Sequence, residues 1–191
     1  MDEMRRGFKT EAEKIAQLVR AELGLGPLDA LDCFVLAEEW GIPVVSLGEL
    51  REDGAKNASI RRLLTGDAGF SATTVVLGTK RLVVYNPRHT PGRNANNLSH
   101  ELSHLILEHE AAPAIGIGGC RHWDGPQEAE ADWLGAAMLV PRESALRWML
   151  RTGDLEEGAH NFGVSVDLFR WRVNHTGVAR QLAARRGYIR R

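Results

Sequence analysis

The stretch from Asn97 to Glu108 reads NLSHELSHLILE, and residues 100–104 within it form the pentad H-E-L-S-H. Residues four apart lie on one face of an α-helix, so the imidazoles of His100 and His104 can reach a single ion. The carboxylate of Glu101, next to the first histidine, can act on a water bound there. The pentad therefore predicts a helix that presents a metal site.

The same helix has a predicted start and a packing face. Thr90 suits an N-cap, and Pro91 suits the first helical position because its missing N–H is not needed there. Apolar residues then recur at helical spacing, at Ala95, Leu98, Leu102, Leu105 and Ile106. The two histidines fall on a different face, which leaves the ligand face free to point into a cleft.

The third ligand decides the class of site, since a catalytic zinc ion takes three protein ligands and a water. The longer pattern H-E-x-x-H-x-x-G-x-x-H is excluded by Leu107 and Glu110, which stand where it needs glycine and histidine. In the thermolysin-like (gluzincin-like) arrangement, a glutamate on a later helix opens an E-x-x-x-D pattern, and the aspartate holds a ligand histidine by its other ring nitrogen. Glu128 and Asp132 fit that pattern.

Three other residues compete for a role at this site. Glu130 lies about 200° around its helix from Glu128, so only one of the two can face the metal; Glu128 is preferred. His122 sits in a glycine-rich loop, residues 111–125, without a helix to aim it. His109 is expected to complement the dipole at the end of the pentad helix.

The residue pattern favours peptide-bond hydrolysis. Glu101 would act as general base on a zinc-bound water, whose pKa the metal lowers, and would pass the proton to the leaving amine. The group that stabilises the oxyanion beside zinc stays open among Tyr85, Arg88, His89 and His122.

Patterns elsewhere predict a helical chain with a small sheet. Helices are expected at residues 11–23, 28–40, 126–140 and 142–151, a short edge-like strand at 42–45, and a hairpin from 68–77 and 81–85. A capping box is expected at Thr10 and Glu13. Residues 48–69 give little signal beyond a helical turn at 49–52 and an irregular segment at 59–64.

Composition indicates an ordinary soluble globular protein. The 191 residues are 43% hydrophobic and 26% charged, with a formal net charge of −1, which argues against a surface built wholly for nucleic acid or anionic membrane. The start lacks the hydrophobic block of a secretory signal and no apolar run is long enough to span a bilayer, so the expected location is cytoplasmic. Cys33 and Cys120 are too few and too far apart for a disulfide framework or a cysteine zinc site.

With the pentad, Glu128 and Asp132 in place, the chain resembles the ImmA/IrrE family of bacterial metallopeptidases. Further familial stretches lie at residues 7–13, 20–25, 36–44, 128–141 and 162–165. The departures are Ser99, Ser103 and Asp132, where alanine, glycine and asparagine are common. The resemblance implies an α+β zincin-like fold, mostly helical, with a small antiparallel or mixed sheet beside the pentad helix.

The resemblance also implies a function. It predicts a zinc (Zn²⁺) endopeptidase that cleaves or inactivates a specific regulatory protein, a helix-turn-helix repressor encoded nearby, in a mobile-element, stress-response or toxin–antitoxin-like context. No membrane partner is expected. The expected domains are a peptidase domain, residues 1–152, and a helix-turn-helix-like helical segment, residues 153–191, packed on it.

A second hypothesis is a DNA-binding or protein-binding regulator with a vestigial metal site. Its support is the basic end of the chain, which from residue 168 onward carries seven arginines and no acidic residue. Such a stretch could meet phosphates. A packed helical end with a solvated charged face is the preferred interpretation.

Overall fold

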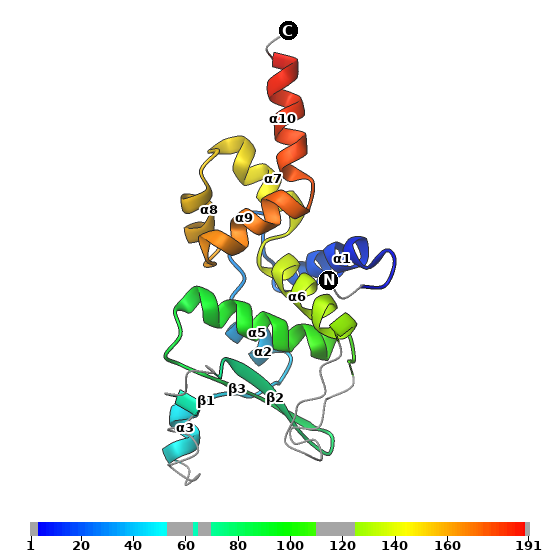
Figure 1. The fold of residues 1–191 in the computed structure, drawn as a ribbon. Helices are drawn as coiled ribbons and strands as arrows, with labels where there is room; N and C mark the ends of the chain where they lie inside the picture. The colour runs from blue at the N-terminus through cyan, green and yellow to red at the C-terminus, as the bar shows by residue number, and fades with distance from the viewer. Residues whose placement is uncertain (1–3, 53–62, 65–69, 110–124, 190–191) are drawn as a thin grey trace. The chain divides into compact units, whose positions relative to one another are not determined.

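The computed structural model describes residues 4–52, 63–64, 70–109 and 125–189, and Figure 1 traces the chain. Two compact units are defined by packing: Met1–Arg5 with Asp32–Asp132, and Arg6–Leu31 with Trp133–Arg191. The division falls within helix α6 (Gly125–Leu139). The expected boundary between residues 152 and 153 stays a prediction.

The first unit contains a mixed three-stranded sheet. Its strands are β1 (Val44–Ser46), β2 (Ala72–Leu77) and β3 (Lys80–Tyr85), in the order β1-β3-β2. β1 runs parallel to β3, and β2 runs antiparallel to it, with Thr74 opposite Val83. The predicted hairpin is confirmed, and its turn uses Gly78 at a φ of 62°, a conformation that suits glycine.

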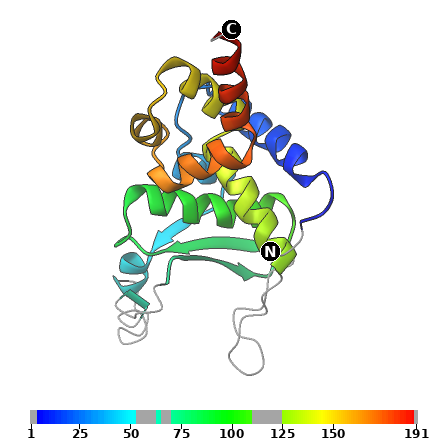
Figure 2. The ribbon, with the colours of Figure 1, turned by 45° about the horizontal axis from the view of Figure 1, so that its top comes forward.

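Both faces of the central strand β3 are covered. Val83 and Val84 are both buried, and successive residues of a strand point to opposite faces. Val84 belongs to a cluster with Leu47, the first residue of helix α3 (Leu47–Glu52), and Phe70 packs against that cluster. Helix α5 (Pro91–Ile106) packs against β2 and β3, as the views in Figures 1 and 2 agree. The sheet therefore supports the helix that carries the pentad.

Helix α5 begins and packs as predicted. The Thr90 side chain accepts a hydrogen bond from the backbone N–H of Arg93, and Pro91 opens the helix. Leu98 and Leu102 are buried, as expected of the apolar stripe. Ser99 and Ser103 are also fully buried, and each hydroxyl donates to a backbone carbonyl of α5 itself, at 2.9 and 2.7 Å respectively. Their polar groups are thus satisfied without contacts outside the helix.

The second helix differs from its predicted range. α2 is confined to Cys33–Glu39, because Asp32 caps it by accepting from the N–H of Phe34 at 2.8 Å. Leu36 is buried in this helix, whereas the next residue toward its start, Val35, is 45% exposed. Burial raises the pKa of the Cys33 thiol to about 12, which keeps it protonated and unreactive.

The second unit is helical in its described residues. It contains α1 (Phe8–Glu22), the last part of α6, α7 (Arg142–Arg151), α8 (Leu155–Asn161), α9 (Val166–His175) and α10 (Val178–Ile189). The predicted turn between α8 and α9 is confirmed. Gly163 has a φ of 65° there, and the Ser165 side chain caps α9 by accepting from the N–H of Leu168.

The expected capping box at the start of α1 is wrong. The helix begins at Phe8, before Thr10, and its N-cap is Gly7 with no side-chain hydrogen bond. Glu13 instead pairs with the guanidinium of Arg172, which is fully buried, and accepts from the N–H of Arg142 at 2.8 Å. A buried cation needs a charged partner, and Glu13 meets that need.

Some predicted features lie outside the described residues. They are the segment 59–62, the start of the hairpin at 68–69, the glycine-rich loop up to residue 124, and His122 within it. In the part of the chain that is described, no helix has both the length and the apolarity to cross a membrane.

Replacement of Gly158 by alanine should destabilise the protein. A Cβ at this position of α8 would stand 2.6 Å from two ring atoms of Phe169 and 2.9 Å from Trp148. Phe169 is fully buried, so its ring has no free space to enter. We expect a loss of about 1–3 kcal/mol in the free energy of unfolding, which exceeds the helix-propensity gain. Chemical denaturation measures it.

Gly48 provides the matched control. It also lies in a helix, but a Cβ there would meet only Ser46 Oγ, at an ordinary 3.5 Å. Gly48→Ala should therefore leave the free energy of unfolding unchanged or slightly raised. Equal effects at the two positions would contradict the packing at Gly158.

Candidate metal centre

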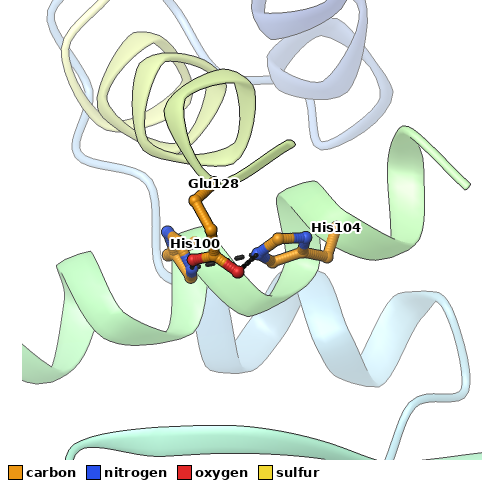
Figure 3. Close-up of side chains that lie close together, drawn as sticks. All are labelled: His100, His104 and Glu128. Atoms are coloured by element: carbon orange, nitrogen blue, oxygen red, sulfur yellow. Dashed lines mark hydrogen bonds and ion pairs between the residues drawn. The ribbon is translucent and has the colours of Figure 1, made fainter. Parts of the chain in front are cut away.

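Helices α5 and α6 bring together three side chains, two histidines from the pentad and one glutamate from α6. His100 and His104 project from α5, and their Nε2 atoms lie 3.0 Å apart. Glu128, in the first turn of α6, places Oε2 at 3.3 Å from His100 Nε2 and Oε1 at 3.6 Å from His104 Nε2. Figure 3 shows the three side chains pointing toward one another. All three belong to the first unit.

The arrangement fits a divalent metal ion. In a tetrahedral zinc site with Zn–N near 2.0–2.1 Å, neighbouring ligand atoms are about 3.3 Å apart. The separations of 3.0, 3.3 and 3.6 Å bracket that value. Each of the three side chains is partly exposed. His100, His104 and Glu128 could therefore hold a metal ion, and two imidazoles with one carboxylate form a donor set that zinc accepts.

The protonation of His100 and the ionisation of Glu128 depend on each other. Burial alone would lower the pKa of His100, but hydrogen bonds to Asp132 and Glu128 outweigh it and raise that pKa to about 9. Hydrogen bonds from His100 and His104 in turn hold the pKa of Glu128 well below its ordinary value. Without a metal, a proton on His100 thus compensates the carboxylates, and metal binding would have to displace it.

Asp132 lies one helical turn after Glu128 and contacts the other side of His100. The Nδ1–H of His100 donates to Asp132 Oδ1 at 2.8 Å. This contact directs Nε2 of the same ring toward Glu128. The E-x-x-x-D spacing thus places one carboxylate near each ring nitrogen of His100.

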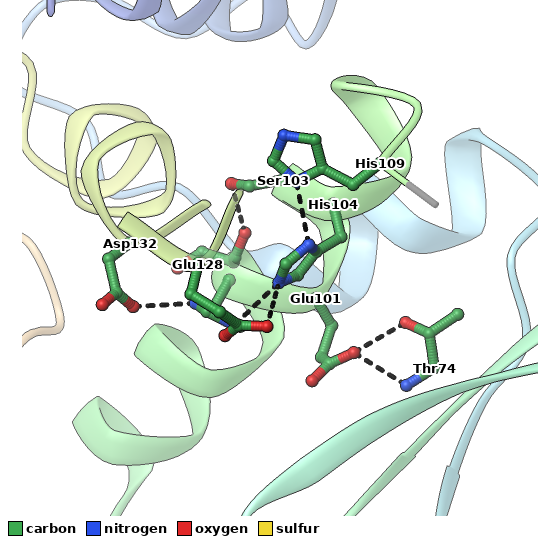
Figure 4. Close-up of polar contacts among 9 residues, drawn as sticks. Thr74, Glu101, Ser103, His104, His109, Glu128 and Asp132 are labelled. Atoms are coloured by element: carbon green, nitrogen blue, oxygen red, sulfur yellow. Dashed lines mark hydrogen bonds and ion pairs between the residues drawn. The ribbon is translucent and has the colours of Figure 1, made fainter. Parts of the chain in front are cut away.

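Glu101 points toward the sheet, and its carboxylate is held there by Thr74. The side chain is largely buried, and its Oε2 accepts from the Thr74 backbone N–H at 2.7 Å and from the Thr74 hydroxyl at 2.8 Å. Figure 4 shows both bonds. Thr74 lies in strand β2, 27 positions before Glu101, and no local pattern in the sequence marks it.

His109 contacts the opposite side of His104, and Glu130 contacts His109 in turn. Glu130 does not join the group formed by His100, His104 and Glu128. Its Oε2 lies 3.6 Å from His109 Nε2, and its Oε1 accepts from the Arg5 N–H at 3.1 Å. His109 Nδ1 lies 2.9 Å from His104 Nδ1. Burial and the neighbouring His104 lower the pKa of His109, which favours its neutral form.

The described candidates for oxyanion stabilisation have other partners. His89 Nε2 lies 3.1 Å from the carbonyl oxygen of Phe70, and the ring of Tyr85 packs edge-on against Phe34 at 5.3 Å between centroids. The backbone N–H of Arg88 donates to Asn86 Oδ1. None of these contacts joins the three residues to His100, His104 or Glu128.

A protein-family model matches the part of the chain that contains this site. The profile of the IrrE N-terminal-like domain, a peptidase family, matches residues 54–174, which include the pentad, Glu128 and Asp132. No curated protein matches the chain in sequence.

The fold is also similar to that of a solved structure. It is a Mycobacterium tuberculosis transcriptional regulator, with a TM-score of 0.52 and 16% sequence identity. The match covers 89% of this chain and 47% of the regulator, so this chain corresponds to about half of that protein. At this identity the likeness concerns the fold alone.

The family match covers more than half of the residues, and the chain belongs to the ImmA/IrrE family of IrrE N-terminal-like domains.

Proposed function

We propose that this protein is a zinc-dependent endopeptidase that acts on a specific regulatory protein. The observation that carries the proposal is the convergence of His100, His104 and Glu128 within 4.8 Å, with Glu101 next to the first ligand in the chain. Membership of a peptidase family supports it. In this proposal the three residues bind Zn²⁺, Asp132 positions His100, and Glu101 is catalytic.

When bound, zinc would polarise the scissile carbonyl and lower the pKa of an attacking water. The residues of the chain would transfer the protons and orient the metal-binding side chains. Glu101 would accept a proton from the water and deliver it to the leaving amine. Both Thr74 hydrogen bonds use Oε2 of Glu101, so the proton would move through Oε1. Asp132 would keep the proton of His100 on Nδ1, which leaves Nε2 to bind the metal.

The proposed substrate is a helix-turn-helix transcriptional repressor encoded near the gene of this protein, in the cytoplasm. The resemblance to the ImmA/IrrE family supports that substrate class. The similar solved structure is titled a transcriptional regulator, which fits a regulatory context although its sequence is distant.

A second candidate is a DNA-binding or protein-binding regulator with a vestigial site. Its support is the row of arginines in α9 and α10, where Arg180 and Arg185 are exposed. Arg172 cannot contribute because it is fully buried against Glu13, and Arg170 pairs with Asp167. Duplex DNA binding that weakens with salt and is lost on deletion of residues 176–191 would favour this candidate.

Replacement of Glu101 by glutamine should abolish cleavage while zinc stays bound. The amide keeps the shape of the side chain but cannot take a proton, so we expect a loss of about 10²–10⁴-fold in rate. The measurement is mass spectrometry of the neighbouring repressor after incubation with zinc-loaded protein, with metal content determined in parallel. Glu108→Gln, an exposed position just after α5, is the matched control. Full cleavage by the Glu101 variant would refute the mechanism.

Replacement of Thr74 by valine should slow cleavage through the position of Glu101. Valine has the same shape as threonine and keeps the backbone N–H, but it lacks the hydroxyl that bonds Oε2. We expect kcat to fall by about 10- to 100-fold with KM little changed, because a misplaced base costs rate rather than binding. Thr74→Ser, which keeps the hydroxyl, should remain close to wild type. Equal rates for the valine and serine variants would argue against this contact.

A further inference from the structure

The ligand histidine His104 has its own supporting contacts, on the side away from Glu128. We propose that His109 and Glu130 position His104 for metal binding, as the counterpart of what Asp132 does for His100. The inference rests on the metal site of the proposed function. It concerns a role in the affinity for the metal, not a direct part in the reaction.

The two ring nitrogens of His104 face different partners. Nε2 faces Glu128 and the other ligand histidine, whereas Nδ1 lies 2.9 Å from Nδ1 of His109. A histidine that binds a metal through Nε2 carries its proton on Nδ1. That proton can be donated only to an acceptor, so His109 must present a lone pair at Nδ1 and carry its own proton on Nε2. Figure 4 shows the two rings joined through these atoms.

Glu130 completes the arrangement on the far side of His109. Its Oε2 lies 3.6 Å from His109 Nε2, which is within ion-pair range but longer than a hydrogen bond. This carboxylate favours the tautomer of His109 that has its proton on Nε2. Glu130 is itself held by Arg5, whose backbone N–H and Nε lie 3.1 and 3.3 Å from Oε1.

The two supporting groups differ in burial. The side chain of Asp132 is 72% exposed, whereas those of His109 and Glu130 are 7% and 10% exposed. Water can replace Asp132 as a partner for His100, but it has little access to the contact behind His104. Removal of His109 should therefore leave the Nδ1 proton of His104 without a partner, which disfavours the metal-binding tautomer.

The backbone at the end of α5 places His109 in this position. The helix ends at Ile106, and Glu108 then adopts a φ of 52°, the only positive φ among described residues other than glycine. The chain turns back there, so the N–H of His109 donates to the carbonyl oxygen of His104 at 3.0 Å. A left-handed conformation at a non-glycine residue is strained, and it persists here where it brings one histidine over another.

A role for His109 as a fourth ligand is excluded by its direction. Its Nδ1 lies against Nδ1 of His104, across the ring from the Nε2 atom that faces Glu128. A single ion therefore cannot bind both Nε2 of His104 and Nδ1 of His109. His109 is accordingly absent from the group of residues whose ligand atoms could share an ion.

The test is the zinc affinity of His109→Phe, measured by competition with a chromophoric chelator. Phenylalanine keeps a ring against His104 but removes both nitrogens. We expect zinc to bind about 10- to 100-fold more weakly, the usual effect of losing such a partner. His109→Asn, which keeps an acceptor near the position of Nδ1, should recover most of the affinity. Glu130→Gln should show a smaller loss. His160→Phe, at an exposed position of α8, is the matched control.

A second measurement separates positioning from folding. In the zinc-loaded wild-type protein, nitrogen-15 NMR of the imidazoles should find the proton of His104 on Nδ1 and that of His109 on Nε2. The opposite tautomer of His109 would overturn the inference, even if the phenylalanine variant did not fold. Tight zinc binding by wild type with unchanged affinity in His109→Phe would also overturn it, and would leave the proposed function intact. A wild-type protein that binds no zinc would overturn both.

Discussion

The centre of the first unit depends on one electrostatic constraint: two imidazoles 3.0 Å apart must share a carboxylate. Two imidazole nitrogens this close cannot both carry a proton without repulsion between the two rings. Each nitrogen therefore needs a carboxylate oxygen nearby. Glu128 meets that need only if the first turn of α6 lies directly over the middle of α5. The packing of α5 on β2 and β3, and its start at Thr90 and Pro91, fix where those nitrogens stand.

The supports of the two histidines follow from the same constraint. A metal-binding imidazole must keep its proton on the nitrogen that faces away from the metal, so each ring needs an acceptor behind it. His100 finds one at Asp132, on the same helix as Glu128. His104 faces the opposite way and finds His109, which the chain brings back through the left-handed Glu108. Glu101, the proposed general base, is held by a third element, the strand that carries Thr74.

Contacts between residues of one helix could be predicted from the sequence, whereas contacts between distant segments could not. Residues on one helix have a fixed angular relation, so spacing could place His100 beside His104 and Glu128 on the same face as Asp132. The same relation could set Glu130 apart from Glu128. Thr74 could not be found, because a hydrogen bond from strand to helix leaves no periodic signal. The capping box failed for a related reason. Thr10 and Glu13 had the right local spacing, but pairing of Glu13 with the buried Arg172 decided its position.

The bond between Thr74 and Glu101 also affects the outer edge of the sheet. Among the described residues β2 is an edge strand of the sheet, and an edge strand exposes backbone donors that can recruit a strand from another chain. Because the Thr74 N–H is already bonded to Glu101 Oε2, one donor in the middle of that edge is occupied. A foreign strand laid along β2 would have to displace a largely buried carboxylate at that point. The contact that holds Glu101 thus also leaves one backbone donor fewer for a foreign strand at this edge of the sheet.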